Sequence, residues 1–83
     1  MINLTLYSRP GCHLCLEMKA IVESVAGTIA APITIDEVDI SKDGDLEARY
    51  GSEIPVLLVD GRKVAKYRVT EGDLRRILAA KKG

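Results

Sequence analysis

The first forty residues follow a strand–helix–strand pattern, and this pattern constrains the fold more than any other feature of the chain. Apolar and polar residues alternate over 2–7, which is typical of a strand. Apolar residues then recur at helical spacing over 12–27, and 33–40 is again rich in Ile and Val. A strand–helix–strand unit crosses over in the right-handed sense and places its two strands parallel. The pattern therefore predicts an α/β fold around a central sheet.

The middle of the chain adds a short helix and a buried strand. The helix is expected to begin near Ser41 or Asp43, which can cap it, and to end at Tyr50-Gly51. The nearly continuous apolar run over 54–59 is typical of a strand that is buried on both faces. Asp60-Gly61 directly after it favours a hairpin turn. The next strand should therefore pair with this one in the antiparallel sense.

The chain ends with that partner strand, over 62–67, and a helix that Thr70 should cap. The buried stripe of this helix is expected to consist of Leu74, Ile77 and Leu78. The predicted order is β-α-β-α-β-β-α. We expect a four-stranded mixed sheet with flanking helices, folded as a single domain over 1–83.

Length and composition exclude several classes of protein. With 83 residues, 47% hydrophobic and 29% charged, the chain has the composition of one small globular domain and not of a disordered segment. No apolar run approaches the roughly 20 residues that a helix needs to cross a bilayer. Residues 1–8 carry neither a cationic region nor a long apolar region, so no secretory signal is expected. These features predict a monomer in the cytoplasm with no membrane partner.

The net charge of zero hides an asymmetry along the chain. Residues 1–61 hold 4 Lys and Arg against 10 Asp and Glu, whereas 62–83 hold 8 against 2. A solvated C-terminal helix explains the basic part, and a basic face for an acidic partner is the alternative. Nucleic-acid binding is not expected, because bases stack on aromatic side chains and the chain has three tyrosines, no Trp and no Phe.

Both cysteines lie in one tetrapeptide, Cys12-His13-Leu14-Cys15, at a strand-to-helix junction. Residues three apart on a helix share a face and can approach to the ~5.5 Å Cα separation of a disulfide. Cys12 at the helix N-terminus would have a lowered thiol pKa, because free N–H groups and the helix dipole stabilise the thiolate. Cys15, one turn deeper, should stay protonated until it reacts. An exposed thiolate beside a shielded thiol favours thiol–disulfide exchange.

Other interpretations of the cysteine pair fit the sequence less well. A structural disulfide across so short a loop stabilises little, and the cytoplasm is reducing. A zinc site normally needs four ligands, and the chain offers two Cys and one His, so no metal site is expected. Two further functions stay open as alternatives to redox catalysis. They are an iron–sulfur or metal carrier that uses Cys12, and a non-catalytic thioredoxin-fold adaptor.

Three segments together resemble the glutaredoxin-like branch of the thioredoxin fold, in particular its small bacterial members. These segments are Tyr7-Ser8-Arg9-Pro10-Gly11-Cys12-His13-Leu14-Cys15, Ile54-Pro55 and Val59-Asp60-Gly61. The resemblance covers essentially the whole chain. It implies a thiol–disulfide oxidoreductase in which Cys12 is the attacking thiol and Cys15 the resolving thiol. It also implies partners: a disulfide-containing protein or small thiol substrate, and a reductase whose type the sequence does not reveal.

The resemblance implies further site residues. Pro55 matches the cis-proline opposite the attacking cysteine, and Ile54 would offer its backbone to an extended substrate. Tyr7 matches the aromatic residue that flanks the sulfur. Arg9 could steady the thiolate or a substrate carboxylate, although a solvated loop arginine is as compatible with the sequence. His13 could tune the Cys12 thiolate, or it could be an exposed residue without a role.

One segment departs from the glutathione-using members of the family. Those members carry a Gly-Gly pair after the hairpin, where this chain has Ala65 and Lys66. Side chains there would crowd a backbone clasp for the carboxylate of glutathione. We therefore expect no bound cofactor, with glutathione left open as a reductant or co-substrate.

Overall fold

The structure of this chain is a computed structural model, and it describes residues 2–81. In chain order the elements are β1 (Ile2–Ser8), α1 (His13–Ala26), β2 (Ile33–Asp39), the 3-10 turn η1 (Ile40–Lys42), α2 (Gly44–Tyr50), β3 (Val56–Val59), β4 (Arg62–Lys66) and α3 (Glu71–Lys81). The predicted order of strands and helices is confirmed, and η1 is an addition to it.

The four strands form one mixed sheet in the order β2-β1-β3-β4. β1 pairs with β2 in parallel, from Ile2 opposite Ile33 to Ser8 opposite Asp39. β3 is antiparallel to β1 and to β4. The parallel pair and the hairpin are both as predicted. Because β1 and β3 occupy the centre, β2 and β4 are the edges of the sheet.

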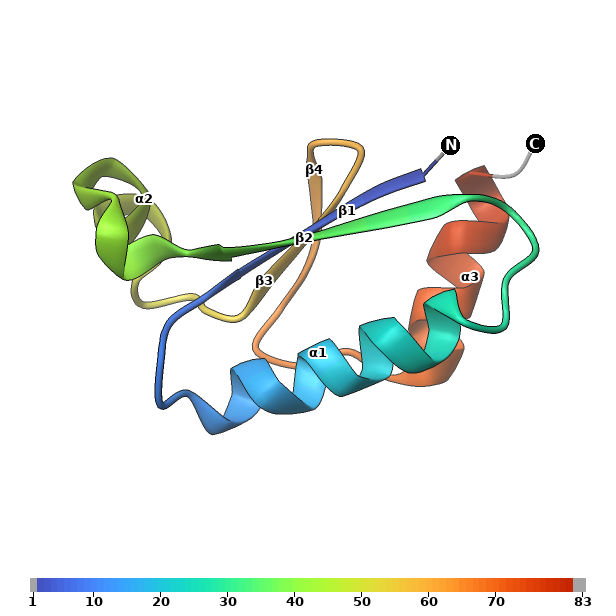
Figure 1. The fold of residues 1–83 in the computed structure, drawn as a ribbon, viewed down its shortest axis with the longest axis horizontal. Coiled ribbons are helices and arrows are strands. Elements are labelled where there is room, and N and C mark those ends of the chain that lie inside the picture. The colour runs from blue at the N-terminus through green and yellow to red at the C-terminus, as the bar shows by residue number, and fades with distance from the viewer. Residues whose placement is uncertain (1, 82–83) are drawn as a thin grey trace.

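The core lies between one face of the sheet and the two long helices, α1 and α3 (Figure 1). β1 alternates in burial, so that Ile2, Leu4 and Leu6 face these helices. The remaining core cluster consists of Met18, Val22, Val25, Leu57, Val59, Val69, Leu74 and Leu78. Leu74 and Leu78 confirm the predicted stripe of the last helix, and Ile77 packs half-buried beside them. The α1 face of the sheet is thus fully covered over its centre.

Side-chain caps fix where the helices begin. The carboxylate of Asp43 accepts hydrogen bonds from the backbone N–H groups of Asp45 and Leu46, at 3.0 and 3.2 Å. The Thr70 hydroxyl accepts one from the Asp73 N–H at 3.0 Å, as expected of the predicted cap. These bonds satisfy N–H groups that a helix leaves unpaired in its first turn.

Each strand differs from its predicted range by one or two residues at one end. β1 includes Ser8, and β4 ends at Lys66 rather than at residue 67. Ile40 lies in η1 rather than in β2, because the Asp39 carboxylate accepts a hydrogen bond from the Ser41 N–H and turns the chain. β3 begins at Val56 and not at Ile54, since Pro55 has no N–H to donate to a sheet. All four residues of β3 are buried, as its apolar run predicted.

α2 lies beyond one end of the sheet, next to η1, whereas α1 and α3 both lie along one face of the sheet (Figure 1). Within residues 2–81, no helix is both long and apolar enough to cross a bilayer.

Candidate active site

The loop between β1 and α1 presents the two cysteines. Gly11 adopts a positive φ of 79°, which glycine reaches without strain, and the chain turns there out of β1. Cys12 follows in an extended conformation as the N-cap of α1, and His13 is the first helical residue. Cys12 therefore lies where the N–H groups of the helix are unpaired.

Cys12 and Cys15 form a disulfide, with their Cα atoms 5.2 Å apart. The backbone N–H of Cys15 also donates a hydrogen bond to the Cys12 Sγ atom, at 3.1 Å. Cys15 is only 3% exposed, whereas Cys12 is half-buried. One sulfur is thus reachable from solvent at a helix N-terminus, and the other lies behind it against the core, as the sequence predicted.

A cavity of about 300 Å³ opens beside the disulfide, on the side of β2. It is lined by Ser8, Arg9, Pro10, Gly11, Cys12, Cys15, Leu16, Glu37 and Asp39. Two sequence-predicted groups, the cysteines and Arg9, therefore meet in one cavity. The carboxylates of Glu37 and Asp39 join them, because the parallel pairing brings the end of β2 beside the end of β1.

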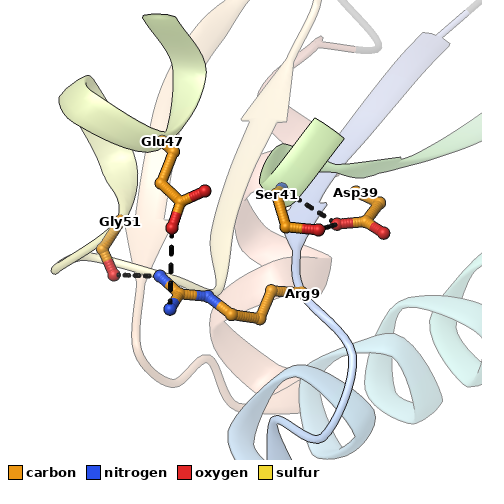
Figure 2. Close-up of polar contacts among 5 residues, drawn as sticks. All are labelled: Arg9, Asp39, Ser41, Glu47 and Gly51. Carbon is orange, nitrogen blue, oxygen red and sulfur yellow. Dashed lines mark hydrogen bonds and ion pairs between the residues drawn. The ribbon is translucent and has the colours of Figure 1, made fainter. Parts of the chain in front are cut away.

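The Arg9 guanidinium is directed toward α2 and the turn after it (Figure 2). Its Nη2 atom donates a hydrogen bond to the Gly51 carbonyl at 3.0 Å, and Nη1 lies 3.9 Å from a Glu47 carboxylate oxygen. Its Nε atom is buried and has no hydrogen-bond partner within residues 2–81. Arg9 thus connects the cysteine loop to the segment that leads to Pro55.

Asp39 stays ionised at the mouth of this cavity. The Ser41 hydroxyl donates a hydrogen bond to its carboxylate at 2.6 Å, and the Ser41 N–H donates another at 2.9 Å (Figure 2). These bonds lower the pKa of Asp39 below 3.8, and the charges of Lys42 and Arg9 lower it further.

Glu37, the second carboxylate of the cavity, links β1, β2 and α1. It accepts a hydrogen bond from the Ser8 hydroxyl at 3.4 Å and forms an ion pair with Lys19 at 3.1 Å. The hydrogen bond from Lys19 to Glu37 and the negative charge of Glu37, with a smaller effect of Glu23, raise the pKa of Lys19 above its ordinary value of 10.5. The Glu37 carboxylate is therefore paired with a cation, whereas the Asp39 carboxylate is held by Ser41.

The peptide bond between Ile54 and Pro55 is cis, as the resemblance implied. The Pro55 carbonyl accepts a hydrogen bond from the Tyr67 N–H at 2.8 Å, and the Tyr67 hydroxyl donates one to the Ser52 carbonyl at 3.0 Å. Tyr67 thus holds this turn from both sides. Within residues 2–81, the backbone N–H and C=O of Ile54 form no hydrogen bond.

Two other predicted site residues have separate surroundings. Tyr7 alternates with the core-facing residues of β1, so its ring lies on the opposite face of the sheet. There it packs against the ring of Tyr50, with the centroids 4.8 Å apart. His13 is exposed at the start of α1. The structure therefore gathers Arg9, Cys12 and Cys15, and it places Tyr7 toward α2.

Sequence reasoning missed Glu37, Asp39 and Tyr67. A signal for the first two was present, because parallel strands joined by a helix end at the same edge of a sheet. This rule alone would have placed the last residues of 33–40 beside Ser8, where the structure has Asp39. Tyr67 carries no comparable signal, since its contacts depend on a positive φ of 67° that non-glycine residues seldom adopt.

Solved structures of other proteins share this fold. A structure from X. campestris, the structural genomics target XcR50, matches with a TM-score of 0.73 and 33% identity over 93% of this chain and 96% of that one. Chloroplastic thioredoxin z matches with a TM-score of 0.79, over all of this chain and 80% of its own. Its identity is 13%, so that likeness shows the thioredoxin fold alone.

Sequence comparisons give the family. The glutaredoxin-like protein YDR286C homolog of Dictyostelium discoideum is 30% identical over 77 residues, which are 88% of this chain and 71% of that protein. The family model described as "Glutaredoxin-like domain (DUF836)" matches residues 3–79. The match includes the cysteine pair, the cis-proline and all four strands, apart from Ile2 at the start of β1. The chain therefore belongs to the glutaredoxin-like domain family DUF836.

Proposed function

We propose that this protein is a thiol–disulfide oxidoreductase that uses a dithiol mechanism. The observation that carries the proposal is the Cys12–Cys15 pair at the start of α1, with the Cys15 N–H donating to the Cys12 sulfur at 3.1 Å. A hydrogen bond to the sulfur and the positive end of a helix both stabilise a thiolate more than a thiol. They therefore favour Cys12 as the nucleophile in the reduced protein.

The proposed reaction transfers two electrons to a substrate disulfide. The Cys12 thiolate attacks one substrate sulfur, so that a mixed disulfide forms and the first substrate thiolate leaves and takes up a proton. Cys15 then loses its proton and attacks the Cys12 sulfur. The Cys12–Cys15 disulfide forms, and the second substrate thiol leaves. The 3% exposure of Cys15 supports its role as the second thiol, because it is shielded from outside disulfides.

The surroundings of Cys12 support a role for the predicted substrate-binding residues. The backbone groups of Ile54, which form no hydrogen bond within the described residues, are suited to pair with an extended substrate beside Pro55. Arg9, which donates a hydrogen bond to the Gly51 carbonyl, would hold the cysteine loop at a fixed distance from the segment that leads to Ile54 and Pro55. Tyr7 would act indirectly, through its packing on Tyr50 of α2. His13, exposed next to Cys12, would lie at the edge of the bound substrate.

The proposal includes a monomeric protein in a reducing compartment such as the cytoplasm, where dithiols are kept reduced. It requires no bound cofactor. The electron donor that we propose is a dithiol reductase and not glutathione. Ala65 and Lys66 lie in β4 where the glutathione-using members have Gly-Gly, and their side chains would crowd the tripeptide carboxylate. Charge-assisted hydrogen bonds of the kind lost there are worth ~1.5–3 kcal/mol each.

Substitution of each thiol tests the mechanism. Cys12→Ser should reduce exchange with hydroxyethyl disulfide and with insulin to the uncatalysed rate, because no nucleophile remains. Cys15→Ser should accumulate a mixed disulfide on Cys12, which intact-mass spectrometry detects. Ser24→Ala, an exposed position far along α1, is the matched control. Full activity of Cys12→Ser would contradict the proposal.

The electron donor is tested by stopped-flow reduction of the Cys12–Cys15 disulfide. We expect reduction by glutathione to be roughly tenfold to a hundredfold slower than reduction by a thioredoxin-type dithiol reductant at equal thiol concentration. A glutaredoxin that carries Gly-Gly serves as the reference. Equal glutathione rates for the two proteins would exclude a steric role for Ala65 and Lys66.

A further inference from the structure

Two neighbouring hollows lie on the side of β4 and α3, and they share no lining residue with the cavity described above. The inner hollow, about 160 Å³, lies between α1 and the segment 67–70. Its apolar lining includes Leu14, which lies between the two cysteines, together with Met18 and Ile21. In Figure 1 the chain after β4 passes α1 here before it enters α3. The inner hollow therefore reaches the turn of α1 that carries the cysteine pair.

The outer hollow, about 400 Å³, lies between β4 and α3. Its floor is apolar and includes Val64, Ala65 and Ile77. Arg68 and Val69 line both hollows, so the two are neighbours on the surface. We call the two hollows together the channel, which extends from Leu14, within the Cys-x-x-Cys motif, to Ile77 of α3.

Cations from three separate segments surround the outer hollow. They are Lys66 at the end of β4, Arg68 in the following loop and Arg76 in α3. Arg68 and Arg76 have side chains that are 75% and 77% exposed. The carboxylates on the channel are Asp73, paired with Arg76, and Glu17, which lies 3.8 Å from Arg68. Lys66 lies over the Tyr67 ring at 5.6 Å and forms no ion pair within residues 2–81.

Much of the negative charge of the molecule lies away from the outer hollow. The acidic residues of β2 lie at the opposite edge of the sheet from β4. A charged partner that approaches Cys12 is therefore drawn to one side of the disulfide by charges on β4 and α3. An apolar floor with a cationic rim matches a peptide that carries an apolar side chain followed by carboxylates.

We propose that the channel is the docking surface for an acidic segment of the partner protein whose disulfide meets Cys12. The apolar residue next to the partner's cysteine would fill the inner hollow, and the carboxylates beyond it would reach Lys66, Arg68 and Arg76. The inference rests on the proposed function for what the partner does, but binding itself needs no redox step.

Fluorescence anisotropy with the oxidised wild-type protein tests the docking without any reaction. The probes are fluorescein-labelled hexapeptides without cysteine, each with two leucines and one serine followed by three Glu, three Gln or three Lys. We expect the Glu peptide to bind about tenfold more tightly than the Gln peptide, and the Lys peptide to bind least. Equal affinity for the Glu and Gln peptides would overturn the proposal.

Two triple variants separate local docking from the effect of net charge. Lys66→Gln with Arg68→Gln and Arg76→Gln should weaken binding of the Glu peptide about tenfold. The matched control is Lys42→Gln with Arg49→Gln and Arg62→Gln, which removes the same charge outside the channel. We expect less than a twofold change in this control. Equal losses in both variants would mean that bulk charge alone attracts the peptide, and would also overturn the proposal.

One further measurement distinguishes a failure of the redox proposal from a failure of the docking proposal. If the reduced wild-type protein does not reduce neutral hydroxyethyl disulfide, the proposed function fails, and the anisotropy series still decides whether the docking surface exists. If it reduces this neutral disulfide but the Glu peptide binds no better than the Gln peptide, the docking proposal fails and the function stands.

Discussion

Gly51 shows how a single missing side chain connects α2 to the cysteine loop. A Cβ atom there would lie 2.5 Å from the Glu47 carbonyl oxygen and 3.3 Å from the Arg9 Nη2 atom. The φ of Gly51 is −55°, which any residue can adopt, so the requirement is for space and not for backbone handedness. The glycine lets the end of α2 close tightly while the Arg9 guanidinium reaches the Gly51 carbonyl.

Substitution of two glycines at opposite ends of α2 tests this requirement. Gly51→Ala should lower the free energy of unfolding by ~1–3 kcal/mol, because the backbone of α2 or Arg9 must move. Gly44→Ala, whose Cβ would meet nothing within 4 Å, should be neutral or stabilise by up to about 1 kcal/mol. Urea denaturation followed by circular dichroism measures both. A loss of stability in Gly44→Ala as large as in Gly51→Ala would contradict the steric account.

At the scale of single residues, the sequence predicted the surroundings of those residues whose neighbours in space are also close in the chain. Cys12 and Cys15 are placed by the helix that they begin, so their burial followed from spacing alone. The partners of Arg9 and Tyr7 lie in α2 or directly after it, roughly forty residues further along the chain. Nothing in the neighbourhood of either residue indicates which side of the loop α2 will occupy.

At the scale of elements, the kinds of strand and helix followed from periodicity, but the order of strands in the sheet did not. The hairpin turn fixed β4 beside β3, and the crossover fixed β2 parallel to β1. The antiparallel pairing of β1 with β3 joins segments about fifty residues apart, with no turn between them to specify it. That pairing brings Tyr7 opposite Val56, and so brings the cis-proline turn to the end of β1.

The exposure of β2 was also not evident from its composition. Its Ile and Val content resembles that of a central strand, yet Thr34, Ile35, Asp36 and Glu37 are all exposed. The physical reason is its position at the edge of the sheet, where only β1 pairs with it. Charged residues on an edge strand also disfavour pairing with another chain. The same edge position gives the cavity beside Cys15 its open side and its two carboxylates.

At the scale of the whole molecule, the fold places the acidic part and the basic part of the sequence on different sides of the sheet. The acidic part includes β2 and α2, and the basic part begins at β4 and continues into α3. Because β2 and β4 are opposite edges of one sheet, a chain of zero net charge acquires two sides of opposite sign. The cysteine pair lies at the end of β1, between them. In the docking that we propose, this arrangement would orient a charged partner before it reaches the disulfide.

A chain of this size depends on a small core, and this predicts an unequal response to two leucine substitutions. Domains are stable by ~0.05–0.15 kcal/mol per residue, which for 83 residues is about 4–12 kcal/mol. Leu57 is fully buried between the sheet and its two helices, so Leu57→Ala should cost ~2–5 kcal/mol and remove much of that stability. Leu16 is 64% exposed, and Leu16→Ala should change it by less than about 0.5 kcal/mol. Urea unfolding with the disulfide intact measures both, and equal losses would show that the core does not dominate the stability of this fold.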